Sequence, residues 1–308
     1  MSIEADAGSS SARRNLATAA APQSRPYVWS VRRELWEHRA TWIAPLAAAG
    51  CVLFGFAISL MRTPHTLKAI SKLTPEKLAA IRFAPFGIAS AAIILTTVLV
   101  GIFYCLGTLY NERRDRSILF WKSMPVSDLT TLLSKITIPL VVLPVMAFVV
   151  VCATQLLMFV LDWAVLASRG GEFAQLWSTV PLVRVWVDVA YGLVALVLWH
   201  APIYSYLLAL SAAVKKGPFL WAVLPPIALS VFEKLAFDTS YVSSLIHDRF
   251  VGGFGRAFSG IGEHKARFQL PVPNPVQFLM SPGLWIGLVI AVGLFALAVW
   301  LRRRREPM

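Results

Sequence analysis

The chain has 308 residues, of which 57% are hydrophobic and 15% charged, and its mean hydropathy is +0.66. Soluble domains average about 25% charged residues, so side chains this apolar would not fit inside a soluble core. The net charge of +13 fits basic residues that flank membrane spans, because the sequence holds no nucleic-acid-binding motif. Composition therefore predicts an all-α polytopic integral membrane protein and argues against nucleic acid as a partner.

The N-terminal region changes character at Tyr27. Residues 1–26 are rich in Ala and Ser and predict a disordered cytoplasmic tail. Beyond them, Val28, Val31 and Leu35 share one helical face, which predicts an amphipathic helix lying in the membrane interface. An ordinary start to the first span explains the pattern about as well. The aromatic and basic residues expected to anchor the helix are Trp29, Arg32, Arg33 and Trp36.

Six apolar runs are long enough to cross a bilayer, since about 20 helical residues span a hydrocarbon core of ~30 Å. The predicted spans of this domain, residues 27–308, are 42–61, 86–109, 129–161, 185–214, 219–237 and 283–301. We expect Pro139 and Pro144 to kink the third span, and Pro225 and Pro226 to break the fifth. The Lys-Lys-Gly-Pro turn at residues 215–218 predicts a tight hairpin between the fourth and fifth spans.

Charge distribution predicts the orientation. Six spans put both termini on one side, and Lys and Arg are more numerous there than in the outer loops, which indicates cytoplasmic termini. The first outer loop, residues 62–85, is basic against this trend, and a solvated charged loop is its simplest interpretation. In the longest outer loop, residues 238–282, helical spacing of apolar residues predicts a short helix at the membrane surface.

A charged stretch, residues 111–128, separates the second span from the third. A helix of about two turns at residues 117–123 would put Ile118 and Trp121 on one side, and Pro125 would end it. An apolar knob with a charged rim is typical of a protein interface. A solvated loop whose aromatic residues lie on the lipid is the alternative.

The third helix is expected to start directly after this stretch. Ser127 is suited to cap it, and Asp128 suits the positive end of the helix dipole. Because the apolar run is longer than one bilayer, the first two turns, with Lys135, should stand in the cytoplasm.

Chemical motifs are absent from the sequence. It holds no Walker A pattern, no HExxH or GxSxG motif and no clustered His/Cys spacing, which predicts no ATPase, catalytic or metal site. His200 is the one ionisable residue, cysteine aside, placed well inside a span. Such polar groups are functional candidates, although a hydrogen bond between helices better explains a lone histidine.

Residues 109–135 resemble the segment after the second span of ABC-2 type transporter permeases, the transmembrane subunits of ABC transporters. That family typically reads Glu-Arg, polar residues, a short apolar segment, Pro-Val/Ile-Ser and a helix with Lys. The family often has an acidic residue in the short apolar segment, where this chain has Ile-Leu-Phe-Trp at 118–121. The matching residues are Glu112, Arg113, Asp115, Ser117, Pro125, Val126, Ser127 and Lys135.

The resemblance implies a permease subunit of the cytoplasmic (inner) membrane without an ATPase or cofactor of its own. By the same resemblance, we expect it to be an exporter. Its implied partners are ATP-binding subunits, which bind the ATP, and a second permease, identical or related. The residues expected to contact the ATPase are Glu112, Arg113, Asp115, Arg116, Ile118, Trp121, Pro125 and Ser127.

Other function classes have less support. An ion- or proton-coupled carrier or channel is the alternative, but the sequence shows neither inverted repeats nor buried charge near the middle of the membrane. A membrane enzyme would need a catalytic constellation, and none stands out. Few charges line the spans, which mildly favours an apolar or amphipathic cargo.

Overall fold

The computed structural model describes residues 26–70, 75–117, 127–167, 182–259 and 272–304, and most of them are helical. The short strands β1 and β2 pair antiparallel. The elements, in chain order, are α2 (Pro26–Glu37), α3 (Ala40–Ile70), α4 (Pro75–Arg114), α6 (Asp128–Thr137), the π-helical η1 (Ile138–Val142), α7 (Leu143–Ala167), α8 (Leu182–Ala213), α9 (Pro218–Phe237), α10 (Tyr241–His247), the π-helical η3 (Asp248–Gly252), α11 (Gly253–Ala257), β1 (Phe258–Ser259), β2 (Val272–Pro273), α12 (Pro275–Leu279) and α13 (Pro282–Arg304).

Among the described residues, six helical stretches are long and apolar enough to cross a membrane, as the sequence predicts. Each matches one predicted span to within a few residues at either end. The chain is therefore an all-α, multi-pass membrane protein. The stretches are Ala40–Met61, Phe83–Arg114, Asp128–Val165, Leu182–Ala213, Pro218–Phe237 and Pro282–Arg304.

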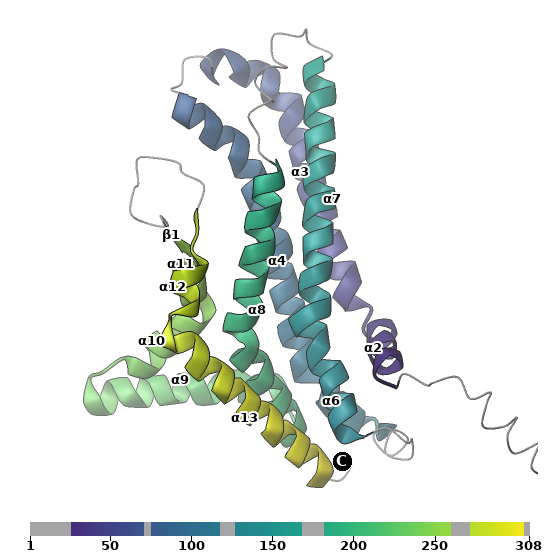
Figure 1. Cartoon of the computed structure of the whole chain (residues 1–308), viewed down its shortest axis with the longest axis vertical. Coiled ribbons are helices and arrows are strands. Elements are labelled where there is room, and N and C mark those ends of the chain that lie inside the picture. The colour runs from purple at the N-terminus through teal and green to yellow at the C-terminus, as the bar shows by residue number, and fades with distance from the viewer. Residues whose placement is uncertain (1–25, 71–74, 118–126, 168–181, 260–271, 305–308) are drawn as a thin grey trace, which may run out of the picture.

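Helices α3, α4, α7 and α8 stand side by side as an upright bundle (Figure 1). Helix α13 packs against α8 and reaches the end of the bundle where α2 and α6 also lie (Figure 1). We call this the α2 end, formed by α2, α6 and the last turns of α4, α8 and α13. The largest apolar cluster among the described residues lies toward this end and includes Tyr104, Leu109, Leu132, Ile136, Leu208 and Ala298.

The third span begins at a cap and changes its winding partway along. The Ser127 side chain accepts a 3.1 Å hydrogen bond from the Thr130 backbone N–H, which confirms the predicted N-cap. Asp128 occupies the first turn, where its charge is favourable. At Pro139 the helix widens into η1 before α7 continues, because proline removes one backbone hydrogen bond.

The prediction of a loop at residues 62–85 is wrong, because most of this stretch is helical. Helix α3 runs on to Ile70 and α4 starts at Pro75, so both helices extend beyond the spans (Figure 1). Proline suits the first position of a helix, and Leu, Ala and Lys, which are frequent in this stretch, are good helix formers. Charge alone does not indicate a loop, because long charged side chains lose little freedom in a helix.

The fifth span, α9, does not form the predicted hairpin. Gly217 adopts the expected left-handed conformation, with φ of +61°. Beyond it, α9 runs across the direction of α8 instead of back along it (Figure 1), and Glu233 is its one buried residue. The hairpin prediction is wrong because the turn determines only where α8 ends and α9 begins. Helix α9 is apolar on all sides, so no single face favours packing along α8.

The break predicted at Pro225 and Pro226 is also wrong, since α9 is continuous through both prolines. Proline fixes φ close to the helical value, so the two residues remove backbone hydrogen bonds without forcing the chain out of the helix. Helix α9 therefore keeps its full length.

The segment expected to form a short external helix is helical, as α10, η3 and α11. Its first part, α10, packs on α9, whereas η3 and α11 pack against the middle of α8. There the Trp199 indole N–H donates a 3.0 Å hydrogen bond to the Asp248 carbonyl. A Cβ at Gly253 would lie 2.5 Å from the Trp199 ring, so only glycine permits this close approach. The glycines of this segment, which weaken a continuous helix, also allow it to pack closely on another helix.

Candidate functional site, a buried charge network

Glu34 brings a carboxylate into the protein at the α2 end. It follows Ser30 by one turn of α2, and both side chains are buried. Glu34 Oε1 accepts hydrogen bonds of 2.8 Å from Lys135 Nζ and 2.8 Å from Arg33 Nη2. Its Oε2 accepts one of 2.9 Å from the Tyr104 hydroxyl. Donors from α2, α4 and α6 therefore meet on one carboxylate.

Lys135 is the cation at the centre of this group. Its side chain is 0% exposed, and its Nζ lies 2.9 Å from Glu112 Oε1 and 2.8 Å from the Thr108 hydroxyl. The sequence predicts that Lys135 stands in the cytoplasm, but its side chain points into the protein. The physical reason is its position on α6, three residues after Leu132 and next to Ile136, on the buried face.

Arg302 joins the other end of the chain to the same group. Its Nη1 donates a 2.9 Å hydrogen bond to Glu112 Oε2, and its Nε donates one of 3.0 Å to Asp128 Oδ1. The guanidinium lies in the last turn of α13 and is 3% exposed. Helices α2, α4, α6 and α13 are thereby connected. We call this group the charge network, and it comprises Arg33, Glu34, Glu112, Asp128, Lys135 and Arg302.

The surroundings of Glu34 keep it ionised. Burial alone raises the pKa of this carboxyl group, but Lys135 and the hydrogen bonds from Arg33 and Tyr104 outweigh it and lower the pKa from 4.5 to about 2. Glu34 therefore carries its negative charge away from water. Removal of one partner from such a buried pair costs about 3–5 kcal/mol, because the other charge is left uncompensated. The network can thus hold four helices in one arrangement.

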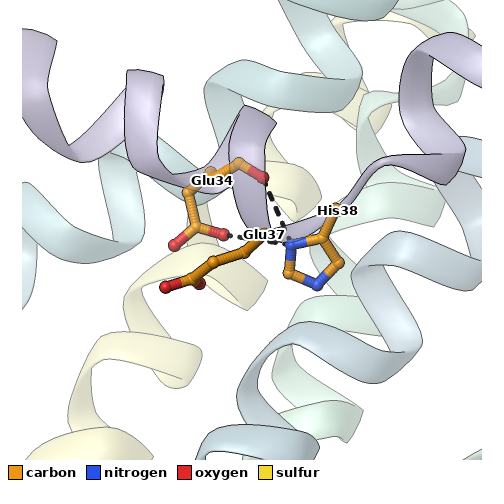
Figure 2. A group of neighbouring side chains, drawn as sticks. All are labelled: Glu34, Glu37 and His38. Carbon is orange, nitrogen blue, oxygen red and sulfur yellow. Dashed lines mark hydrogen bonds and ion pairs between the residues drawn. The ribbon is translucent and has the colours of Figure 1, made fainter.

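Glu34, Glu37 and His38 offer ligand atoms within 4.8 Å of one another, a spacing that could hold a metal ion. Figure 2 shows these three side chains at the end of α2. The Glu34 oxygens, however, already accept hydrogen bonds from Lys135 and Tyr104. A metal ion would have to displace a buried lysine cation, so we assign Glu34 to the charge network and not to a metal site.

The residues expected to contact an ATPase divide by burial. Glu112 is buried in the charge network, and Arg113 is buried with its Nη1 donating a 2.6 Å hydrogen bond to the Ala212 carbonyl at the end of α8. Asp115 and Arg116 are exposed beyond the end of α4. The first two therefore hold helices together, while the second two are open to a partner.

Most of the other residues expected to contact the ATPase lie within residues 118–126. Ser127, just beyond them, is exposed and caps α6. Glu112 before them and Asp128 after them share Arg302, so the charge network holds both sides of this stretch. Ile118 and Trp121, which form the predicted apolar knob, and Pro125, which is expected to end its helix, lie outside the part of the chain that the structure describes.

The predicted interfacial anchors divide between two faces of α2. Trp29, Arg32 and Trp36 lie on the outward face and are exposed. Arg33 is partly buried and pairs with Glu34 in the charge network. Helix α2 therefore has an inner face built from charge pairs and an outer face built from aromatic and basic side chains.

His200, the candidate for an intramembrane site, is buried in α8. Its Nδ1 lies 3.0 Å from the carbonyl of Leu196, one turn earlier in the same helix. Its ring meets Phe250 edge-on, with centroids 6.4 Å apart. The hydrogen bond expected between helices is thus made within α8, and the contact between segments is an aromatic one.

Sequence reasoning missed two members of the charge network. The sequence patterns single out neither Glu34 nor Arg302. A signal existed for Glu34, because it follows Ser30 by one turn and borders the apolar face that holds Val31. Arg302 carries no such signal, since only the approach of α13 to α6 brings it to Asp128.

Comparison with family models, with curated proteins and with solved structures gives no match to this chain, so a functional assignment depends on its sequence and geometry.

Proposed function

We propose that this chain is the transmembrane permease subunit of an ABC transporter, driven by ATP hydrolysis in a separate nucleotide-binding subunit. The resemblance of residues 109–135 to ABC-2 type permeases motivates the proposal, with export across the cytoplasmic (inner) membrane as the expected direction. In this proposal the α2 end faces the cytoplasm, with both termini, and α2 lies in the membrane interface.

The position of the charge network is the observation that best supports this function. Glu112 and Asp128 flank the segment that would dock on the ATPase, and Arg302 bonds both. Lys135 extends the connection to α2. A displacement of this segment by an ATPase would therefore act on four helices at once, which is what transmission of mechanical work requires.

The second proposed partner is another copy of the permease or a related one, as the resemblance to ABC-2 type permeases implies. Helix α9 leaves the bundle and exposes a continuous apolar surface. Within a membrane this surface would contact lipid wherever a second copy does not cover it. The larger exposed apolar side chains on α9 include Phe219, Leu220, Trp221, Ile227, Phe232 and Leu235.

Co-purification with a nucleotide-binding subunit encoded beside this chain tests the function. The change Trp121→Asp puts a charge into the expected apolar anchor. A central aromatic anchor contributes about 2 kcal/mol or more, so we expect at least a roughly thirtyfold loss of affinity between the subunits. Transport-coupled ATPase activity should fall with it.

The matched control is Trp163→Asp, the same change at an exposed tryptophan near the far end of α7. It should leave the complex intact, because Trp163 lies at the other end of the bundle from the proposed docking segment. Equal binding by the Trp121 and Trp163 variants, or the lack of any complex with the native chain, would contradict the proposal.

A further inference from the structure

The outer face of α2 combines a cation with two aromatic rings and takes no part in the charge network. Trp29 is 63% exposed and Trp36 is 70% exposed. The guanidinium carbon of Arg32 lies 5.6 Å from the centre of the Trp29 ring and 5.2 Å from that of Trp36. An open hollow of ≈ 480 Å³ runs along this face, and Arg33 and Glu37 complete its lining.

We propose that this face binds the phosphate headgroup of an anionic phospholipid. The planar fork of Arg32 matches two phosphate oxygens, and a lysine would not reproduce that geometry. Trp29 and Trp36 would contact the glycerol region beside the phosphate, the depth at which tryptophan is most favourable in a membrane. The inference requires that α2 lies on the membrane, and it does not require an ATPase partner.

The charges around the site favour an anion. Glu37, the one acid that lines the hollow, already pairs with Arg33 at 3.5 Å. Among the described residues, Arg32 forms no ion pair with a carboxylate. Among the described residues of the α2 end, the exposed acids are Glu37 and Asp115. The exposed basic residues there, which outnumber them, include Arg32, Arg39, Arg114, Arg116, Arg303 and Arg304.

The site lies on the opposite face of α2 from the charge network. Arg33 follows Arg32 on α2 and pairs with Glu34, which Lys135 and Tyr104 hold from inside the bundle. A headgroup bound at Arg32 therefore fixes the outer side of a helix whose inner side is fixed by the network. Anionic lipid would stabilise the arrangement of α2 on α4 and α6.

Tryptophan quenching by brominated lipids tests the site in the full-length chain. The chain is reconstituted into vesicles of equal parts phosphatidylcholine and phosphatidylglycerol, with bromine on the acyl chains of one lipid at a time. The signal of α2 is the difference between the native chain and the double variant Trp29→Phe, Trp36→Phe. We expect this signal to be quenched more by brominated phosphatidylglycerol than by brominated phosphatidylcholine.

Three variants identify the group that binds. Arg32→Gln should abolish the preference for phosphatidylglycerol, and Arg32→Lys should retain part of it, because the charge stays while the fork is lost. Arg39→Gln is the matched control, since Arg39 is exposed near the end of the same helix but does not lie over the two rings. It should keep the preference.

Two results would overturn the proposal. Equal quenching by both brominated lipids would mean that α2 contacts the bilayer without selecting a headgroup. Loss of quenching by both lipids when a nucleotide-binding subunit is added would mean that this face is a protein interface. Neither result depends on transport activity, so failure of this inference is distinguishable from failure of the proposed permease function.

Discussion

Lys135 donates a 2.8 Å hydrogen bond to Glu34, although 101 residues separate the two in the sequence. Both side chains are 0% exposed. The change Lys135→Met removes the cation and leaves Glu34 and Glu112 buried without it. We expect a loss of about 3–5 kcal/mol in the free energy of unfolding, because an uncompensated buried charge is costly. Denaturant unfolding of the chain in detergent measures this loss.

Lys216→Met is the control for this change, because Lys216 is exposed at the turn after α8. A surface change of this kind usually stays within about 0.5 kcal/mol. The double variant Glu34→Gln, Lys135→Met should recover part of the loss, since it removes a buried acid together with its base. Equal stability of the Lys135 and Lys216 variants would contradict the burial of this pair.

The depressed pKa of Glu34 predicts a loss of stability in acid. The folded state lowers this pKa from 4.5 to about 2, so it binds the proton more weakly than the unfolded state does. The resulting stabilisation is fully present above about pH 4.5 and is lost as the pH falls toward 2, a total of roughly 3 kcal/mol. Unfolding midpoints measured between about pH 6 and pH 3 should reveal it.

Glu34→Gln should flatten that acid dependence, because glutamine does not titrate in this range. Glu37→Gln, on the outer side of the same helix with 45% of its side chain exposed, should leave it unchanged. An identical acid profile for the native chain and the Glu34 variant would show that this carboxylate is not the group responsible.

Arg113, on the neighbouring α4, caps the C-terminal end of α8. Its 2.6 Å hydrogen bond reaches the Ala212 carbonyl, one of the groups left without a partner at a helix end. Arg113→Met should destabilise the protein by about 1–3 kcal/mol, as expected for loss of a charged donor to a buried carbonyl. Arg114→Met, at the exposed next position, should change the unfolding free energy far less. Thermal unfolding in detergent compares the two.

Features that depend on a few neighbouring residues could be predicted from the sequence. The six helical stretches that are long enough to cross a membrane follow from the length of the apolar runs. The Ser127 cap and the left-handed Gly217 follow from local backbone chemistry. In the same way, Glu112 and Arg113 were singled out by their place in a short segment, although their contacts were not foreseen.

Features that depend on distant parts of the chain could not be predicted. Lys135 looks like a solvated cation until α2 supplies Glu34 and α4 supplies Glu112, because a charge is buried only where partners from other elements compensate it. The direction of α9 and the approach of residues 241–259 to Trp199 likewise depend on tertiary packing. No local periodicity encodes such contacts.

Gly253 and Gly255 offer a matched pair of tests of that packing within α11. A Cβ at Gly253 would meet the Trp199 ring at 2.5 Å, whereas nothing lies within 4 Å of one at Gly255. Gly253→Ala should cost about 1–3 kcal/mol, because the buried indole has no space into which to move. Gly255→Ala should be neutral or stabilise by up to about 1 kcal/mol, since alanine favours the helix. Thermal unfolding in detergent distinguishes them, and equal effects would contradict the packing of α11 against α8.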